Sequence, residues 1–203
     1  MIFENYYCTF DNPFSENFIA EIKKEGLATK QQKASIGVLD KKKNTKIRKS
    51  KISWIKNPLV YDHTNPYIHK ANLLSNCVIS LPIFFFCRCN SCTMLTGSLM
   101  VLAFSFKHCN MDGHTDSYGE GPHKGKMRKL SSILLLSEPG KDFEGGEFEI
   151  DFDSCGGKGK KIVTELKKGT FIVFPSFVKH RVKPVTKGIR HSMVLWHLGF
   201  PWK

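Results

Sequence analysis

A dense run of short apolar segments after residue 130 constrains the fold more than any other feature of this chain. The segments follow one another with glycine-bearing turns between them: LSSILLLSE, EFEIDFD, IVTELKKG, TFIVFP, HRVKPV and RHSMVLWHLGF. Short strands at close spacing, joined by such turns, are typical of an antiparallel sandwich or barrel. The second half of the chain therefore predicts a β-core.

The first part of the chain predicts helices beside that core. DNPFSENFIAEIKKEG indicates a helix that Ser15 caps, that carries an apolar stripe and that ends at Gly26. ASIGVLD and KISWI predict strands around a basic loop, and NPYIHKANLLSN predicts a second helix that starts near Thr64 or Asn65. Helices first and strands later is the order of a mainly β, α+β fold with helices packed on one side. A chain of 203 residues suits one domain.

The net charge of +13 favours acidic partners or surfaces. Much of it lies in three runs, KKKNTKIRKSK at 41–51, HKGKMRK at 123–129 and KGKK at 158–161. Solvated loops are the ordinary interpretation of such runs, and a nucleic-acid track would add exposed aromatic residues, which these runs lack. The charge thus allows a nucleic-acid partner, but the pattern does not favour one.

The cysteine count and the N-terminal sequence indicate the cellular compartment in which the chain is expected to reside. Seven cysteines is an odd number, and MIFENYYCTF is acidic and aromatic where a secretory signal would be basic and then apolar. We expect free thiols in a reducing, cytoplasmic compartment.

Residues 71–106 differ from their surroundings. Arg88 is their only charged residue, whereas 24% of the whole chain is charged, and five of the seven cysteines lie in or just beyond them. A membrane span is disfavoured, because Pro82 and the polar RCNSC interrupt the roughly 20 apolar residues that a span needs. A zinc or iron–sulfur site has a C-x-C-x-x-C spacing but no matching second pair; its ligands would be Cys87, Cys89, Cys92 and Cys109. Buried strands or helix are the default.

A histidine and an aspartate two positions apart, His114 and Asp116, form the strongest chemical motif. In a strand, side chains at i and i+2 share a face and can converge on one ion. The alternative is a surface turn, because DSYGEG follows at once. His180, which follows the strand TFIVFP, supplies a third donor from a distant strand. Two histidines and one carboxylate form a facial triad that leaves open positions on iron(II) for a chelating co-substrate and dioxygen.

Arg190 lies ten residues after His180, across a turn at TKG, and Ser192 shares its face. With a tight turn, the offset along the barrel is about 15 Å at 3.3 Å per residue. That is too far for metal binding, but it suits a guanidinium that grips the remote carboxylate of a ligand chelated to the metal. Taken alone, Arg190 predicts only a surface salt bridge.

Together these motifs resemble the iron(II)- and 2-oxoglutarate-dependent dioxygenases, in particular the prolyl 4-hydroxylase-like branch with its bacterial and phage PKHD-type hydroxylases. The resemblance covers about 110–200 closely and 1–75 loosely. It implies a double-stranded β-helix, or jelly-roll (cupin-like), core. It also implies that His114, Asp116 and His180 bind Fe(II). By the same resemblance, Arg190, with Ser192, binds the far carboxylate of 2-oxoglutarate.

The implied reaction is hydroxylation of an unactivated C–H bond of a peptidyl proline or lysine, or of a small molecule. It consumes dioxygen and 2-oxoglutarate, releases succinate and CO2, and uses ascorbate as the reductant. Asp116 favours hydroxylation, since halogenating relatives lack this carboxylate. One rival is an AlkB-like nucleic-acid demethylase, but that branch carries two arginines close together after the distal histidine, and this chain has only Arg190 there. The other rival is a non-catalytic cupin-like binding barrel with a vestigial metal site.

The implied domain is single, 1–203, with support from 1–75, the anomalous segment 77–112 and a catalytic β-core at 113–200. Relatives carry a tyrosine on the strands just before H-x-D, whereas no tyrosine stands between Tyr67 and Tyr118. We hypothesise that roughly 77–112 was read in a shifted frame, which resequencing decides. If the stretch is genuine, co-substrate binding beside the metal is affected.

Several other residues are expected to have structural roles or to lie near the cleft, and not to bind the metal. Trp54 and Trp196 are expected in the core or lining a cleft, and Lys49 and Ser50 border the substrate cleft by resemblance. Arg128 meets either an acidic substrate group or solvent. Three further histidines are expected at the surface or in strands and not as ligands: His123, His191 and His197. The sequence sets neither the substrate nor the oligomeric state.

Overall fold

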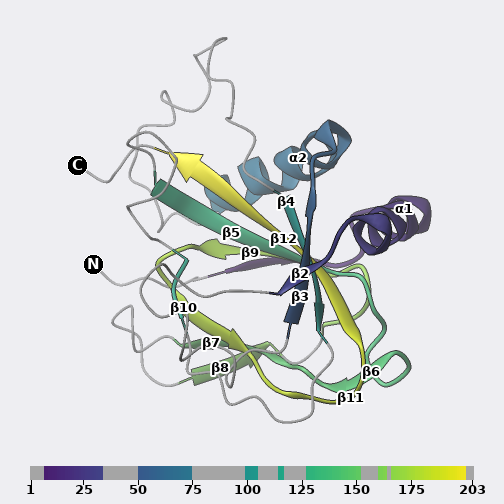
Figure 1. The fold of residues 1–203 in the computed structure, drawn as a ribbon. Coiled ribbons are helices and arrows are strands. Elements are labelled where there is room, and N and C mark those ends of the chain that lie inside the picture. Colours follow the sequence, from purple (N-terminus) through teal and green to yellow (C-terminus); the bar gives the residue numbers. More distant parts are fainter. Residues whose placement is uncertain are drawn as a thin grey trace.

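The computed structural model describes residues 7–33, 50–74, 99–104, 114–116, 127–151, 160–163 and 166–199 of the chain. Strands dominate these residues, and the helices α1 (Glu16–Ala28) and α2 (Pro58–Leu74) accompany them (Figure 1). Among the described residues, no helix is both long enough and apolar enough to cross a membrane.

The strands form one large sheet and smaller partners. The large sheet runs in the order β1 (Cys8–Phe10), β9 (Phe171–Pro175), β5 (Met127–Leu135), β12 (Arg190–Gly199), β4 (Leu99–Phe104), β3 (Ser50–Ile55) and β2 (Gln32–Lys33). The small strands are β10 (Lys179–Val182), β7 (Phe148–Asp151) and β8 (Lys160–Val163) in one sheet, and β11 (Val185–Gly188) with β6 (Phe143–Gly145). Every pairing between these strands is antiparallel, so the predicted antiparallel β-core is confirmed.

Alternation along the central strands divides the apolar residues between two clusters. On β12, Met193 and Leu195 join an outer cluster with residues of both helices, whereas Val194 and Trp196 face an inner cluster. The inner cluster joins the large sheet to the small strands through residues such as Ile133, Phe174, Phe148, Ile150 and Val185. Side chains two apart on a strand share a face, so each central strand is apolar on both faces. This arrangement explains why the segment ILLL, residues 133–136, is apolar at every position.

The first helix begins as predicted but ends later. Ser15 caps α1, and its Oγ accepts the backbone N–H of Phe18 at 3.2 Å. Gly26 does not end the helix, because it is buried against neighbouring residues and the chain continues helical to Ala28. Thr29 then closes the end, since its hydroxyl donates to the carbonyl of Glu25 at 2.8 Å.

The predicted start of the second helix near Thr64 or Asn65 is wrong. The helix begins at Pro58, and the side-chain oxygen of Asn57 accepts the backbone N–H of Leu59 at 3.1 Å. Proline suits a first helical position, where its missing N–H leaves no unpaired donor. Pro66 lies inside the helix, where the packing of α2 against the core offsets the lost hydrogen bond.

The segment HRVKPV forms two strands and not one. β10 ends at Val182 and pairs with β7, whereas β11 begins at Val185 and pairs with β6. Pro184 lies at the break, where a residue that cannot donate to a ladder is tolerated. The chain therefore changes partner before it reaches Arg190.

Part of the anomalous segment is described. Residues 99–104 form β4, which pairs with β3 on one side and β12 on the other. The remainder, 77–98 and 105–112, lies outside the described residues, and with it the cysteine-based metal site. The reading-frame hypothesis stays a prediction. The expected strand ASIGVLD also lies outside the described residues.

Candidate metal centre

An antiparallel bridge places two histidines opposite each other. The backbone N–H of His114 donates to the carbonyl of His180 at 2.9 Å, and the N–H of His180 donates back at 2.8 Å. The N–H of Asp116 donates to the carbonyl of Ser176 at 2.7 Å, which extends the pairing along the chain. Residues opposite each other and residues two apart point to one face, so all three side chains project together.

The three side chains form one compact donor cluster. One ligand atom from each of His114, Asp116 and His180 lies within 4.8 Å of the others. The Nε2 atom of His180 lies 3.6 Å from Oδ2 of the carboxylate, and the Nε2 atom of His114 lies 3.8 Å from Oδ1. Two neutral imidazoles and one carboxylate are the donor set that suits a six-coordinate transition metal with open positions. The residues present therefore fit an iron(II) ion.

The surroundings of His180 fix its ring. Its Nδ1 lies 2.9 Å from the carbonyl of Val178, so an Nδ1–H donates there and the Nε2 lone pair is left for a metal. The ring of Phe174 meets the imidazole edge-on with centroids 4.6 Å apart, and that of Phe148 lies 5.7 Å away. His180 is 6% exposed, so rotation of the ring would have to displace packed aromatic side chains.

Asp116 is held by hydroxyl groups. Ser131 of β5 donates to Oδ2 of Asp116 at 2.7 Å, and the same hydroxyl lies 2.9 Å from that of Ser176. Burial raises the pKa of Asp116, but His180, the Ser131 hydrogen bond, His114 and the Trp196 indole outweigh burial and hold the pKa below its ordinary value. The carboxylate form, which is the form that binds metals, is thus favoured at neutral pH.

A cation stacked on an aromatic ring lies beside the donor cluster. The guanidinium carbon of Arg128 is 3.8 Å from the ring centroid of Trp196, which is a close cation–π contact. Burial lowers the pKa of Arg128, while the charge of Asp116 opposes that shift, so the guanidinium and the carboxylate influence each other. Both Arg128 and Trp196 are only partly buried, so this pair borders the donor cluster on a side that solvent reaches.

Arg190 and Ser192 form a second polar pair on the inner face of β12. The guanidinium Nη1 donates to the hydroxyl of Ser192 at 2.9 Å, and Arg190 is 1% exposed. Burial lowers the pKa of Arg190 to about 10, which leaves it charged at neutral pH. By alternation, Arg190, Ser192, Val194 and Trp196 share one face of the strand, so the arginine and the donor cluster face the same interior.

The route to Arg190 differs from the tight turn expected from the sequence. The chain leaves β10 in the small sheet, forms β11 against β6 and then enters β12 in the large sheet. The estimate of 15 Å along one ladder therefore does not apply. The reason is Pro184, which separates β10 from β11 and allows the chain to cross between sheets.

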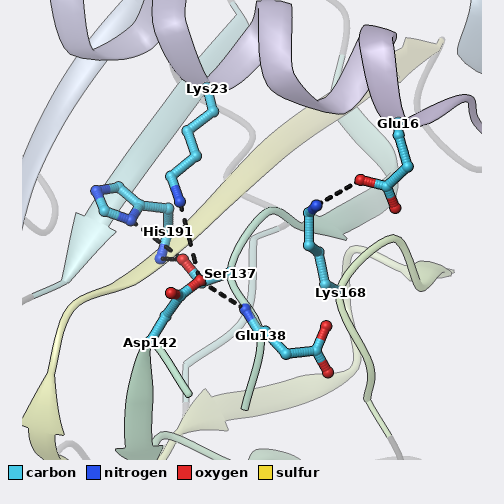
Figure 2. A network of polar contacts seen from close by, with 7 residues as sticks. All are labelled: Glu16, Lys23, Ser137, Glu138, Asp142, Lys168 and His191. Carbon is cyan, nitrogen blue, oxygen red and sulfur yellow. Dashed lines mark hydrogen bonds and ion pairs between the residues drawn. The ribbon is translucent and has the colours of Figure 1, made fainter. Parts of the chain in front are cut away.

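A polar network fixes the entry of β12. Figure 2 shows His191, Ser137 and Asp142 close together below Lys23 of α1. The hydroxyl of Ser137 accepts the backbone N–H of His191 at 3.0 Å and lies 3.1 Å from its Nδ1. Asp142 lies 3.9 Å from Lys23 Nζ, and its backbone carbonyl accepts the N–H of Ile189 at 3.0 Å. The residues on both sides of Arg190 are therefore held by hydrogen bonds.

Comparisons with known proteins bear on this arrangement. The family model of the 2OG-Fe(II) oxygenase superfamily matches residues 100–198. A PKHD-type hydroxylase of Acidovorax ebreus is 36% identical over 86 residues, which is 41% of this chain and 35% of that protein. The PKHD-type hydroxylase PiuC of Pseudomonas aeruginosa is 34% identical over 90 residues, 43% of this chain and 37% of that protein.

These matches support a 2OG-Fe(II) oxygenase of the PKHD type. It spans about a third of the length of the curated PKHD-type relatives that it matches. The matched family uses Fe(II), 2-oxoglutarate and dioxygen.

Solved structures of this oxygenase family share the fold. The viral collagen prolyl hydroxylase of Paramecium bursaria Chlorella virus-1 matches with a TM-score of 0.62 at 17% identity, covering 97% of each chain. A prolyl-4-hydroxylase of Pseudomonas putida matches with a TM-score of 0.61 at 16% identity, covering 98% of this chain and 95% of that chain. The antiparallel β-rich fold is thus that of the double-stranded β-helix oxygenases.

Sequence reasoning did not assign a role to some residues that surround the donor cluster. Ser131 interrupts an apolar strand, and a buried hydroxyl in such a place must have a hydrogen-bond partner. That interruption is the sequence signal that could have identified Ser131 as a residue near the site. The stacking of Arg128 on Trp196 joins β5 to β12, and no local sequence pattern predicts it.

His191 lies in the network of Figure 2, and His197 is buried at 7% exposure on the outer face. Lys49 and His123, and the side chain of Ser50, lie outside what the structure describes.

Proposed function

We propose that the protein is an iron(II)- and 2-oxoglutarate-dependent oxygenase that hydroxylates an unactivated C–H bond of a peptidyl proline or lysine. The observation that carries the proposal is the donor cluster of His114, Asp116 and His180, whose ligand atoms lie within 4.8 Å of one another. The match of residues 100–198 to the 2OG-Fe(II) oxygenase family model supports the same reaction.

In this proposal the donor cluster holds one Fe(II). Bound iron supplies the activation of dioxygen, coupled to conversion of 2-oxoglutarate to succinate and CO2. His180 presents Nε2 because Val178 holds its Nδ1–H, and Asp116 presents a carboxylate that Ser131 orients. Ascorbate as reductant follows from the resemblance.

Arg190 is proposed to bind the far carboxylate of 2-oxoglutarate. The guanidinium is buried and charged, and Ser192 Oγ holds its Nη1 at 2.9 Å. Guanidinium and carboxylate groups pair in a planar, two-pronged way, and the pairing is stronger when water is excluded.

The substrate is proposed to approach past Arg128 and Trp196. This pair borders the donor cluster and is partly exposed, so its guanidinium can donate to a peptide carbonyl while the indole contacts an apolar ring such as that of proline. The names of the relatives, PKHD-type hydroxylase and collagen prolyl hydroxylase, support a peptidyl substrate.

Succinate formation tests the proposal. Purified protein is incubated with Fe(II), 2-oxoglutarate, ascorbate and dioxygen, with a proline-containing peptide or its alanine counterpart. We expect succinate and a hydroxylated product with the proline peptide, loss of both in His180→Ala, and retention in His63→Ala, which alters an exposed histidine on α2. A protein that shows no iron-dependent binding of 2-oxoglutarate contradicts the proposal and favours a binding barrel. Turnover confined to methylated oligonucleotides would favour the demethylase.

A further inference from the structure

Gly146 lies against the side chain of Arg190. A Cβ built on Gly146 would stand 3.0 Å from Cδ of Arg190, 3.0 Å from Cγ2 of Val185 and 3.2 Å from Cε2 of Phe143. Cδ is the atom that carries the guanidinium, so displacement of Cδ moves the group that is proposed to grip the co-substrate. The side of Gly146 on which a side chain would stand therefore lies against the aliphatic part of the Arg190 side chain.

The backbone on both sides of the contact is fixed, so crowding cannot be relieved by moving a strand. Ile189 donates its N–H to the carbonyl of Asp142 at 3.0 Å, and His191 donates its N–H to Ser137 Oγ at 3.0 Å. The N–H of Gly146 donates to the carbonyl of Pro184 at 3.0 Å. The side chains that meet the added methyl group, those of Arg190, Val185 and Phe143, must therefore give way.

We propose that Gly146 is a positioning residue for 2-oxoglutarate: by having no side chain, it lets the guanidinium of Arg190 reach the geometry that pairs with the co-substrate carboxylate. The inference rests on the proposed function. A methyl group at this position shifts Cδ by a few tenths of an ångström and rotates the guanidinium. Two-pronged pairing tolerates only about 0.5 Å of misplacement, so the affinity for 2-oxoglutarate falls.

The chain offers a matched control for the backbone effect. Gly146 and Gly140 both have positive φ, +69° and +78°, but a Cβ on Gly140 would meet nothing within 4 Å. Alanine at either position carries the strain of a left-handed backbone conformation. Alanine at position 146 also adds contacts with Arg190, Val185 and Phe143. The difference between the two variants therefore reports these contacts without the backbone effect, and the NMR signal of Arg190 shows whether its guanidinium moves.

The experiment measures the Kd of 2-oxoglutarate by calorimetry with Mn(II) in place of iron, together with the NMR signal of the Arg190 Nε–H in the ligand-free protein. We expect Gly140→Ala to bind like the wild type, and Gly146→Ala to bind at least 10-fold more weakly with a shifted Arg190 signal. Equal Kd values for the two variants, with an unmoved signal, overturn the inference and leave the proposed function intact.

Two further outcomes are decisive. If the wild type itself does not bind 2-oxoglutarate, the proposed function fails and the role of Gly146 fails with it. If Gly146→Ala does not fold, the two alanine variants are compared in a Val185→Ala background, where one of the two 3.0 Å contacts is absent. A Kd difference of at least threefold is then expected, and equal values overturn the inference.

Discussion

Ser131 donates a hydrogen bond to Oδ2 of Asp116 at 2.7 Å from the middle of β5, while the adjacent Ser132 faces the other side of the sheet and lies 3.4 Å from Nε2 of His197. Both serines are fully buried. They therefore separate the effect of supporting the candidate ligand from the general cost of losing a buried hydroxyl.

Removing the Ser131 hydroxyl is expected to weaken metal binding. Ser131→Ala leaves Asp116 free to rotate and raises the pKa of its carboxyl group, so we expect a loss of about 10- to 100-fold in Mn(II) affinity. Ser132→Ala should leave that affinity unchanged. Metal titration followed by calorimetry checks both variants, and an equal affinity in the two would remove Ser131 from the account.

Arg128 is expected to act on the substrate and not on the co-substrate. Arg128→Met removes the guanidinium above Trp196, and we expect KM for a proline peptide to rise about 10-fold or more while the Kd of 2-oxoglutarate stays unchanged. Arg128→Lys keeps the charge and should lose less. Steady-state kinetics with varied peptide gives KM and kcat separately, and a change in kcat alone would contradict this role.

Arg190 is expected to be needed as an arginine. Arg190→Lys keeps a cation but loses the planar fork, so we expect 2-oxoglutarate to bind about 10-fold more weakly. Arg190→Met removes the charge, and the loss should exceed 100-fold, while the Mn(II) affinity of the donor cluster is kept. Unchanged 2-oxoglutarate binding in Arg190→Met would show that the co-substrate is held elsewhere.

The clustering of His114 and Asp116 could be predicted from their local, periodic spacing, whereas adding the distant His180 depended on the resemblance to a known family. His114 and Asp116 share a strand face by alternation alone, and the strand TFIVFP leads directly to His180. The remainder depended on partners that are distant in sequence. Ser131 meets Asp116 because segment 114–116 pairs with residues 176–180 next to β5, and Arg128 meets Trp196 because β5 lies beside β12.

The errors in the predicted elements have physical causes. Gly26 and Pro66 are residues that usually end or begin helices, but both lie within helices because packing against the core outweighs local preference. Pro184 divides HRVKPV into two strands with different partners, which periodicity alone cannot distinguish from one long strand.

Buried His197 is expected to make the fold sensitive to acid. Burial lowers its pKa to about 4, with a smaller effect of His69, whereas its pKa in the unfolded chain is about 6.5. Between these values the unfolded state binds the additional proton, so the free energy of unfolding decreases as the pH falls from about 6.5 to about 4, by about 3 kcal/mol in all.

Urea unfolding between pH 7.5 and pH 4.5 measures this effect. His197→Gln cannot titrate, so its free energy of unfolding should depend less steeply on pH than that of the wild type. Parallel curves for the two proteins would mean that His197 does not cause the acid sensitivity.

The central claim is that His114, Asp116 and His180 hold one ferrous ion, and anaerobic titration with Fe(II) tests it most directly. We predict one ion bound per wild-type chain, and a loss of more than 100-fold in affinity in Asp116→Ala and in His180→Ala, with unchanged binding in His63→Ala. Binding of one Fe(II) with wild-type affinity in either of the first two variants would contradict the claim.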